Sequence, residues 1–129
     1  TPFPLDTGIS MIHPADVGEA SAEVILNQDY AGDAYFMTGA LVTIGDALNE
    51  ISKALGKDIE YVNVTLEQME QAMLEKNMPD WLVAHALALT EICTNGGMAG
   101  VTDWVNKLTG HPPKTLSEWV NSSKAAFGG

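Results

Sequence analysis

The feature that most restricts the fold of this chain is an ordered alternation of short apolar runs with helix-start signals. The apolar runs are rich in residues that favour strands, and they occupy residues 9–13, 34–38 and 59–64. Helical patterns separate them along the chain. Because strands separated by helices join through crossover connections, the sequence predicts an α/β fold with a few short strands and five to six helices.

Three of the expected helices begin with a capping box, in which a Thr and a polar residue three positions later exchange side-chain to backbone hydrogen bonds. The pairs are Thr43 with Asp46, Thr65 with Gln68, and Thr115 with Glu118. Further helices are predicted from Pro14 to about Asn27, over residues 79–94, and from Thr102 or Asp103 to Leu108. The helix that begins at Thr115 is expected to carry Phe127 on its apolar side.

The helix that follows Thr43 has the clearest apolar face. Its members recur at helical spacing before Gly56 ends the pattern; they are Ile44, Leu48, Ile51 and Leu55. We expect these four side chains to be buried together.

Cys93 is the one cysteine of the chain. It shares a face of the predicted helix over residues 79–94 with Leu82, Ala86 and Leu89, so a small buried apolar side chain is expected there rather than a nucleophile. A single cysteine excludes an intrachain disulfide and suggests a reducing compartment.

An ordered set of motifs extends from about residue 9 to residue 120. The motifs are the strand-to-helix turn His13-Pro14-Ala15-Asp16-Val17, the pattern of Gly32, Tyr35, Phe36, Thr38 and Gly39, and the segment TGHPPKTLSEWV over residues 109–120. In this order and at these spacings they resemble the second half of the NmrA-like branch of the atypical short-chain dehydrogenase/reductase superfamily. The resemblance implies a Rossmann-type, NAD(P)-binding protein with oxidoreductase activity.

The same resemblance predicts how the chain is organised. Residues 1–129 would form a single domain, the C-terminal, substrate-side part of an NmrA-like protein, and the dinucleotide-binding N-terminal half would be absent. Thr1 in place of Met agrees with a processed, truncated or excised product.

A dinucleotide-binding half needs a strand, a Gly-rich turn and a helix N-terminus whose N–H groups face the pyrophosphate. Gly96, Gly97 and Gly100 instead follow a helical pattern, and Gly128-Gly129 form a tail. The Tyr-x-x-x-Lys pair of ordinary short-chain dehydrogenases is also absent. NAD(P) is thus implied by the family only. We expect no cofactor-binding or catalytic residues, and no binding of NADH or NADPH by this chain alone.

The charge of the chain limits which classes of partner it can bind. It carries 17 acidic residues against six basic ones, all Lys, and its net charge is −11. Such a charge repels polyanions, and no Arg is present to grip a phosphate, so nucleic-acid binding is not expected. No stretch has the roughly 18 apolar residues of a membrane span, and no secretory signal is visible. The sequence therefore predicts a cytoplasmic protein that does not bind membranes.

Three residues are predicted to bind substrate. His13 ends a strand that opens into a helix, which is where α/β folds bind ligands; a structural role as a helix cap or as partner of a backbone carbonyl is the alternative. Met78 and Trp81 lie in a link between two helices. With Met73 and Met98 they would suit an apolar lid over a flat hydrophobic substrate such as a quinone. Ordinary core packing is the alternative for these side chains. No metal site is expected, because the His and Cys residues lack ligand spacing.

Two functions are consistent with these residues. The first is the substrate-binding part of an NAD(P)-dependent oxidoreductase for a quinone or similar small hydrophobic carbonyl compound, not catalytically competent alone. The second is a non-catalytic NmrA-like module for redox sensing or protein interaction, so the sequence leaves open whether the protein is an enzyme. The expected partners are a small-molecule substrate and either the missing cofactor half or another copy of this chain, which would cover an exposed apolar surface.

Overall fold

The structure is a computed structural model that describes residues 1–127. The Gly128-Gly129 tail and the side chain of Phe127, which the sequence assigns to the last helix, lie outside this description. In chain order the elements are β1 (Gly8–Ser10), α1 (Pro14–Leu26), the 3-10 helix η1 (Gln28–Tyr30), β2 (Leu41–Thr43), α2 (Ile44–Leu55), α3 (Leu66–Glu75), α4 (Asp80–Thr94), α5 (Trp104–Thr109), α6 (Leu116–Ser122) and the 3-10 helix η2 (Lys124–Phe127). The predicted class, few short strands with five to six helices, is confirmed over these residues.

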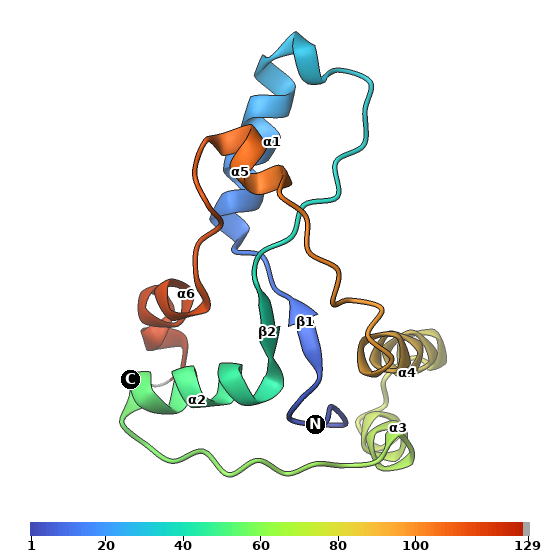
Figure 1. The fold of residues 1–129 in the computed structure, drawn as a ribbon. Helices are drawn as coiled ribbons and strands as arrows, with labels where there is room; N and C mark the ends of the chain where they lie inside the picture. The colour runs from blue at the N-terminus through green and yellow to red at the C-terminus, as the bar shows by residue number, and fades with distance from the viewer. Residues whose placement is uncertain (128–129) are drawn as a thin grey trace.

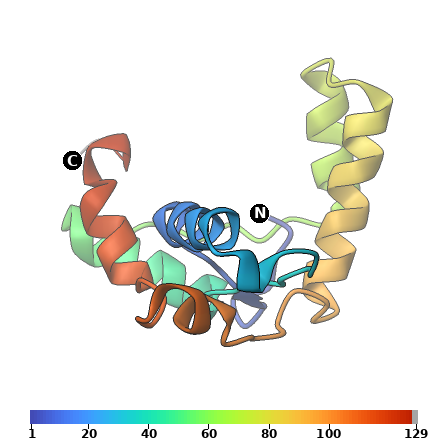
Figure 2. The same ribbon diagram turned by 90° about the horizontal axis from the view of Figure 1, so that it is seen from above.

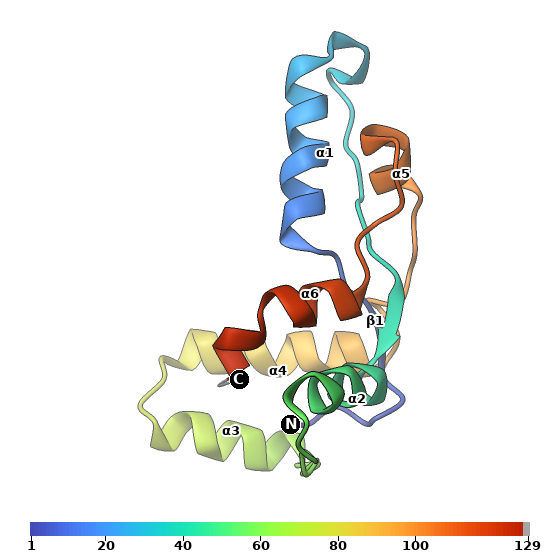
Figure 3. The same cartoon turned by 90° about the vertical axis from the view of Figure 1, so that its left-hand side faces the viewer.

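Three pairs of helices extend from a ribbon of two strands (Figure 1). Helix α1 packs on α5, α2 packs on α6, and α3 packs on α4 as a hairpin. Seen from above, the α3–α4 hairpin and the α2–α6 pair stand on opposite sides of the molecule (Figure 2). Figure 3 shows α1 rising away from the level of α2, α3 and α4. The described chain is therefore open in shape, with each helix pair largely separate from the others.

The strands that form are not the ones expected. β1 overlaps the first apolar run and pairs antiparallel with β2, with Gly8 opposite Thr43 and Ser10 opposite Leu41. The expectation of strands over residues 34–38 and 59–64 is wrong for the described structure, and so is the expected crossover between the strands.

Both unpaired runs are held only at isolated points. The N–H of Thr102 donates to the Thr38 hydroxyl at 2.8 Å, beside the second run. In the third run, the Thr1 ammonium donates to the Val62 carbonyl at 2.8 Å and the Val64 N–H donates to the Thr1 carbonyl at 3.0 Å. A strand needs a ladder of successive backbone bonds. In neither run do these contacts continue as a ladder, so neither run becomes a strand.

At Gly39, directly after the run of residues 34–38, the chain crosses over the residues that follow β1. A Cβ atom at this position would lie 1.8 Å from the carbonyl oxygen of Met11. Only glycine permits two backbones to approach so closely. The crossing brings the residues that follow β1 next to the residues that precede β2, and this junction becomes one wall of the candidate site.

All three predicted capping boxes are present. In each, the Thr hydroxyl accepts from the N–H of the third helical residue, whose side chain accepts from the Thr N–H. In α2 the two bonds join Asp46 N to Thr43 Oγ1 at 3.0 Å and Thr43 N to Asp46 Oδ2 at 3.1 Å. Gly56 ends α2 in the left-handed region, with φ 64°, as a C-cap glycine is expected to do.

The buried apolar core is small and is divided among the helix pairs. Within residues 1–127 its members are Ala20, Val83, Cys93, Val105, Leu108 and Val120. Cys93 is buried, as expected of a small apolar side chain. On α4 the buried face is centred on Val83 and Thr90 rather than on Leu89, which stays exposed. Thr90 tolerates burial because its hydroxyl donates to the Ala86 carbonyl at 2.8 Å.

The apolar face of α2 is less buried than the sequence suggests. All four members of the predicted stripe are half-buried, so the expectation that they are buried together is wrong. The reason lies in what faces the helix. Ile44, Leu48 and Ile51 line an open groove of about 420 Å³ with Ile59 and Tyr61, and no further element closes it in the part of the chain that is described.

Candidate functional site

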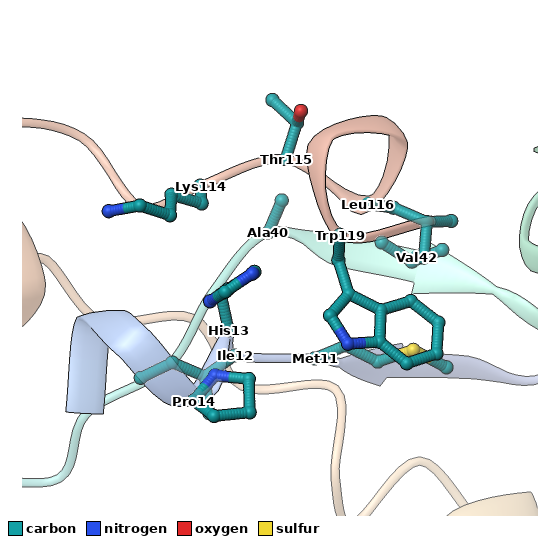
Figure 4. Close-up of a pocket in the computed structure, with 10 residues that line it drawn as sticks. All are labelled: Met11, Ile12, His13, Pro14, Ala40, Val42, Lys114, Thr115, Leu116 and Trp119. Carbon is teal, nitrogen blue, oxygen red and sulfur yellow. The ribbon is translucent and has the colours of Figure 1, made fainter. Parts of the chain in front are cut away.

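The main candidate site is an apolar pocket of about 360 Å³ where the turn into α1, strand β2 and the start of α6 meet (Figure 4). Its lining comes from residues 11–14, from Ala40 and Val42, and from residues 114–116 with Trp119. Figure 4 shows the His13 ring extending from the β1–α1 turn and the Trp119 ring extending from α6. Three segments that are far apart in the sequence thus supply the walls.

His13 belongs to both the turn and the pocket. The Ala15 N–H donates to His13 Nδ1 at 3.0 Å, so the imidazole caps α1. Pro14 follows at the first helical position, where a residue without an N–H is favoured. This is the structural role that the sequence left as an alternative. Because the ring also lines the pocket, a cap and a ligand contact are compatible at this position.

Asp16 holds the opposite wall of the pocket in place. Its side chain is completely buried, and it accepts from the Lys114 backbone N–H at 2.7 Å and from Lys114 Nζ at 3.0 Å. The hydrogen bond to Asp16 raises the pKa of the Lys114 ammonium above its ordinary value, against the opposing effect of burial. No local sequence pattern around Asp16 indicates this partner, which lies 98 residues away.

A second polar contact joins the same two segments one helical turn further along α1. His111 Nε2 lies 3.0 Å from Glu19 Oε1, and His111 Nδ1 lies 2.9 Å from the Pro112 carbonyl. The Pro112 carbonyl and the Glu19 carboxylate both raise the pKa of His111. We call Asp16, Glu19, His111 and Lys114 the latch, since together they fasten residues 111–114 to α1.

The residue after the latch is fixed by the start of α6. The Thr115 hydroxyl donates to Glu118 Oε2 at 2.7 Å and accepts from the Glu118 N–H at 3.2 Å. Hydrogen bonds from the Thr115 N–H and hydroxyl lower the pKa of Glu118. The polar atoms of Thr115 therefore belong to the cap of α6. The pocket wall at residues 114–116 is held by the latch before Thr115 and by this cap after it.

Met78 and Trp81 do not lie in this pocket. Met78 follows α3 and is half-buried, and the Trp81 side chain, in the first turn of α4, is 70% exposed. Figures 2 and 3 both show the α3–α4 turn at the end of the hairpin that points away from the strand ribbon. The structure therefore does not bring the predicted lid residues next to His13, and their role in substrate binding stays a prediction.

A dinucleotide pyrophosphate is bound by a Gly-rich turn between a strand and a helix. The β1–α1 turn is Met11-Ile12-His13 and contains no glycine. The N–H of Ala15, in the first turn of α1, already donates to His13 Nδ1. The β2–α2 junction has no loop residues, and its first N–H groups include Asp46 N, which bonds Thr43. Neither junction matches a Gly-rich phosphate turn.

Two further features of the described chain bear on function. No group of three or more His, Cys, Asp or Glu side chains within residues 1–127 is placed to hold a metal ion. None of the described helices combines the length and the apolar character that a membrane crossing requires.

Several pocket residues were missed by the sequence analysis. Met11, Lys114 and Trp119 reach the pocket through contacts between segments, which no local pattern reveals. The motif over residues 109–120 contains Lys114 and Trp119, but it indicates a family resemblance and not which segments these two side chains contact.

Known proteins resemble nearly the whole chain. An NAD(P)H azoreductase of Xenophilus azovorans is 33% identical over 98% of this chain and 45% of its own length. Quinone oxidoreductase 2 of Escherichia coli K12 is 30% identical over 90% of this chain and 41% of its own length. The chain thus spans less than half the length of these curated relatives. No protein-family model matches it.

Solved structures also resemble nearly the whole of this chain and less than half of their own length. The NADPH-dependent quinone oxidoreductase of Escherichia coli, complexed with NADPH, superposes with a TM-score of 0.79 at 28% identity, over 91% of this chain and 42% of that one. A nucleoside-diphosphate-sugar epimerase from Staphylococcus aureus has a TM-score of 0.81 at 21% identity, over 94% of this chain and 43% of that one, which shows a shared fold.

In fold and in sequence the chain is similar to the NmrA-like oxidoreductases. Within that class, this chain matches the C-terminal part of an NmrA-like reductase, in agreement with the motifs found in its sequence. Its relatives include NAD(P)H-dependent proteins and oxidoreductases of quinones and azo compounds.

Proposed function

We propose that this chain is the substrate-binding part of an NAD(P)-dependent oxidoreductase that acts on a quinone or a similar small hydrophobic carbonyl compound, and that it is not catalytically competent alone. The observation that carries the proposal is the pocket at the β1–α1 turn, which joins apolar walls to the imidazole of His13. In α/β folds, ligands bind where strands end and helices begin.

The dimensions and chemistry of the pocket suit a flat molecule. Binding sites for small ligands usually occupy roughly 300 to 1,000 Å³ and combine apolar walls with a few polar groups. At about 360 Å³ this pocket is at the small end of that range. Met11, Val42 and Leu116 provide apolar surface, and the Trp119 ring provides a flat one. A one- or two-ring quinone matches such a space.

The nucleotide would be bound by a second component. The named relatives are more than twice as long as the part that this chain matches, and neither strand-to-helix junction fits a pyrophosphate. We propose that the partner is the cofactor-binding half of an NmrA-like protein, with a second copy of this chain as the alternative. The apolar end of α1, where Ile25 is 74% and Leu26 80% exposed, supports a partner of either kind.

Met78 and Trp81 enter this proposal as residues that face the cofactor half. Both lie on the hairpin, outside the His13 pocket. In a complete protein the second component would have to bring substrate and hairpin together for these side chains to act as a lid.

Binding measurements on the full chain test the proposal. Equilibrium dialysis should show saturable binding of 1,4-naphthoquinone, weakened in Trp119→Ala because a pocket wall is lost. Leu89→Ala, at an exposed apolar position on α4 outside the pocket, is the control and should bind as the unchanged chain does. NADPH should give no binding heat in calorimetry, and NADPH with naphthoquinone should show no turnover. Absence of quinone binding, or micromolar NADPH binding, would refute the assignment and favour the sensor or interaction module.

A further inference from the structure

We propose that His13 selects, through its Nε2–H group, ligands that present a hydrogen-bond acceptor such as a carbonyl oxygen beside a flat apolar ring. This inference rests on the proposed function, since it assigns a specific task to one residue of the same pocket. It makes His13 a specificity-determining residue whose protonation pattern is fixed by the fold.

The helix start determines which nitrogen carries the proton. His13 Nδ1 accepts the Ala15 N–H at 3.0 Å, and an acceptor nitrogen must have its lone pair free of a proton. In the neutral ring the proton is then on Nε2. The capping bond thus keeps one tautomer, and that tautomer offers a donor.

The side chains of Lys114 and Thr115, which also line the pocket, are engaged elsewhere. Lys114 Nζ binds Asp16, and the Thr115 hydroxyl binds Glu118. Within residues 1–127 no protein group accepts a hydrogen bond from His13 Nε2, and this nitrogen is not buried out of reach. Figure 4 shows the His13 ring extending from the chain into the space between the β1–α1 turn and the segment of Lys114 and Thr115. Its Nε2–H is therefore available to a ligand.

The position of the ring at a helix start strengthens this donor. A helix N-terminus carries partial positive charge, and a hydrogen bond received by one ring nitrogen polarises the ring, so the N–H on the other side becomes a better donor. A neutral imidazole at a helix N-terminus is suited to polarising a carbonyl group. An acceptor-bearing ligand would satisfy the N–H, whereas a plain hydrocarbon would leave it unpaired against apolar walls.

A pair of ligands of almost equal shape tests the idea. Equilibrium dialysis of the full chain against 1,4-naphthoquinone and against naphthalene gives the ratio of the two affinities. In His13→Ala and His13→Asn the preference for the quinone should fall roughly three- to tenfold, the range expected for one neutral hydrogen bond. Naphthalene binding should change little.

The Asn variant separates the two roles of His13. Asn is a good N-cap, so α1 should form normally, which circular dichroism can verify, yet its shorter amide cannot occupy the place of Nε2–H. Leu89→Ala, at an exposed position on α4, should keep the ratio of the unchanged chain. Equal binding of both ligands by the unchanged chain, or an unchanged ratio in His13→Asn, would overturn the inference while leaving the proposed pocket intact. If neither ligand binds, the proposed function fails and this inference fails with it.

Discussion

The latched side of the molecule and the α3–α4 hairpin are stabilised in opposite ways. On the latched side, polar groups from α1 and from residues 111–114 meet across 98 positions of sequence, and Asp16 is completely buried there. The hairpin is built from neighbouring segments, and its helices meet where the buried Thr90 hydroxyl of α4 lies 3.8 Å from Met69 Sδ of α3. The loop that follows the hairpin is bonded to the ribbon through Ser10, whose N–H and hydroxyl donate to the Met98 carbonyl at 2.8 and 2.7 Å.

This difference suggests a division of tasks. Buried polar contacts have strict geometry, so they hold a wall in one position. They occur where the pocket needs its walls fixed. The hairpin leaves Trp81 and Ile92 exposed on α4. Neither residue lines the pocket, and together they offer an apolar surface for contact. The predictions below test this contrast, from the largest expected effect to the smallest.

The largest effect is expected where the backbones cross. In Gly39→Ala the new Cβ would collide with the Met11 carbonyl, a backbone atom that cannot rotate away. Overpacking of this kind costs about 3 kcal/mol, measured as the loss of unfolding free energy in urea. Gly100→Ala, in the loop after the hairpin, has open space around its Cβ and should stay within about 0.5 kcal/mol. Equal losses in both variants would contradict a special role for the crossing.

Removing the charge of Asp16 should have the next largest effect. Asp16→Asn weakens two hydrogen bonds to Lys114, one of them to an ammonium group, and bonds to charged groups contribute about 2 to 3 kcal/mol. Urea unfolding should show this loss. Asp80→Asn makes the same change at an exposed position in the first turn of α4, and about 0.5 kcal/mol is expected there. A larger loss at Asp80 would reverse the contrast between the two regions.

A smaller and local effect is expected from the hairpin core. Val83→Ala removes two buried carbons, worth about 1.5 kcal/mol, from a side chain on α4. Because the hairpin has few contacts with the rest, amide hydrogen exchange should become faster in α3 and α4 but not in α1 or α5. Val105→Ala, with the same truncation on α5, should show the reverse pattern. Faster exchange throughout the chain in either variant would indicate one cooperative unit.

The smallest effect is expected at the outer arm of the latch. The folded-state pKa of His111 is raised by the Pro112 carbonyl and Glu19, so its protonated form stabilises the fold. This contribution is fully present below the ordinary His pKa of about 6.5 and is lost as the pH rises through the higher folded-state pKa. The stability difference between the unchanged chain and His111→Gln should therefore shrink from pH 5.5 to pH 8.5 in urea titrations. Glu19→Gln should reduce the same pH dependence, and a difference that grows with pH would contradict the assignment.

Local signals predicted the helix starts well, and they failed for strands. Thr43 and Asp46 form their capping box because both partners lie within one turn, and the same holds at Thr115. A strand depends on a partner that can be anywhere. Residues 34–38 have the composition of a strand but no adjacent ladder in the described structure, while Leu41–Thr43 pairs because Gly39 brings it beside β1.

The candidate site was predictable at one point only. His13 was found because it follows a strand and precedes a helix, a local pattern. Lys114 was not found, because its contact with Asp16 spans 98 positions and neither residue is unusual in its own neighbourhood. Burial of the α2 stripe was overestimated for a related reason, since periodicity shows which face is apolar but not whether another element covers it.

The long reach of the latch also has a consequence for how the chain folds during synthesis. The Ser10 hydroxyl donates to the carbonyls of Met98 and Gly100, which lie 88 and 90 positions later in the chain. Asp16 accepts from the N–H of Lys114, 98 positions later. Contacts of such high sequence separation raise the contact order and slow folding, because loop closure must precede the contacts that reward it. As the chain leaves the ribosome, the α3–α4 hairpin can form from its own neighbours while Asp16 still lacks Lys114. We therefore expect the pocket wall to be among the last parts to form.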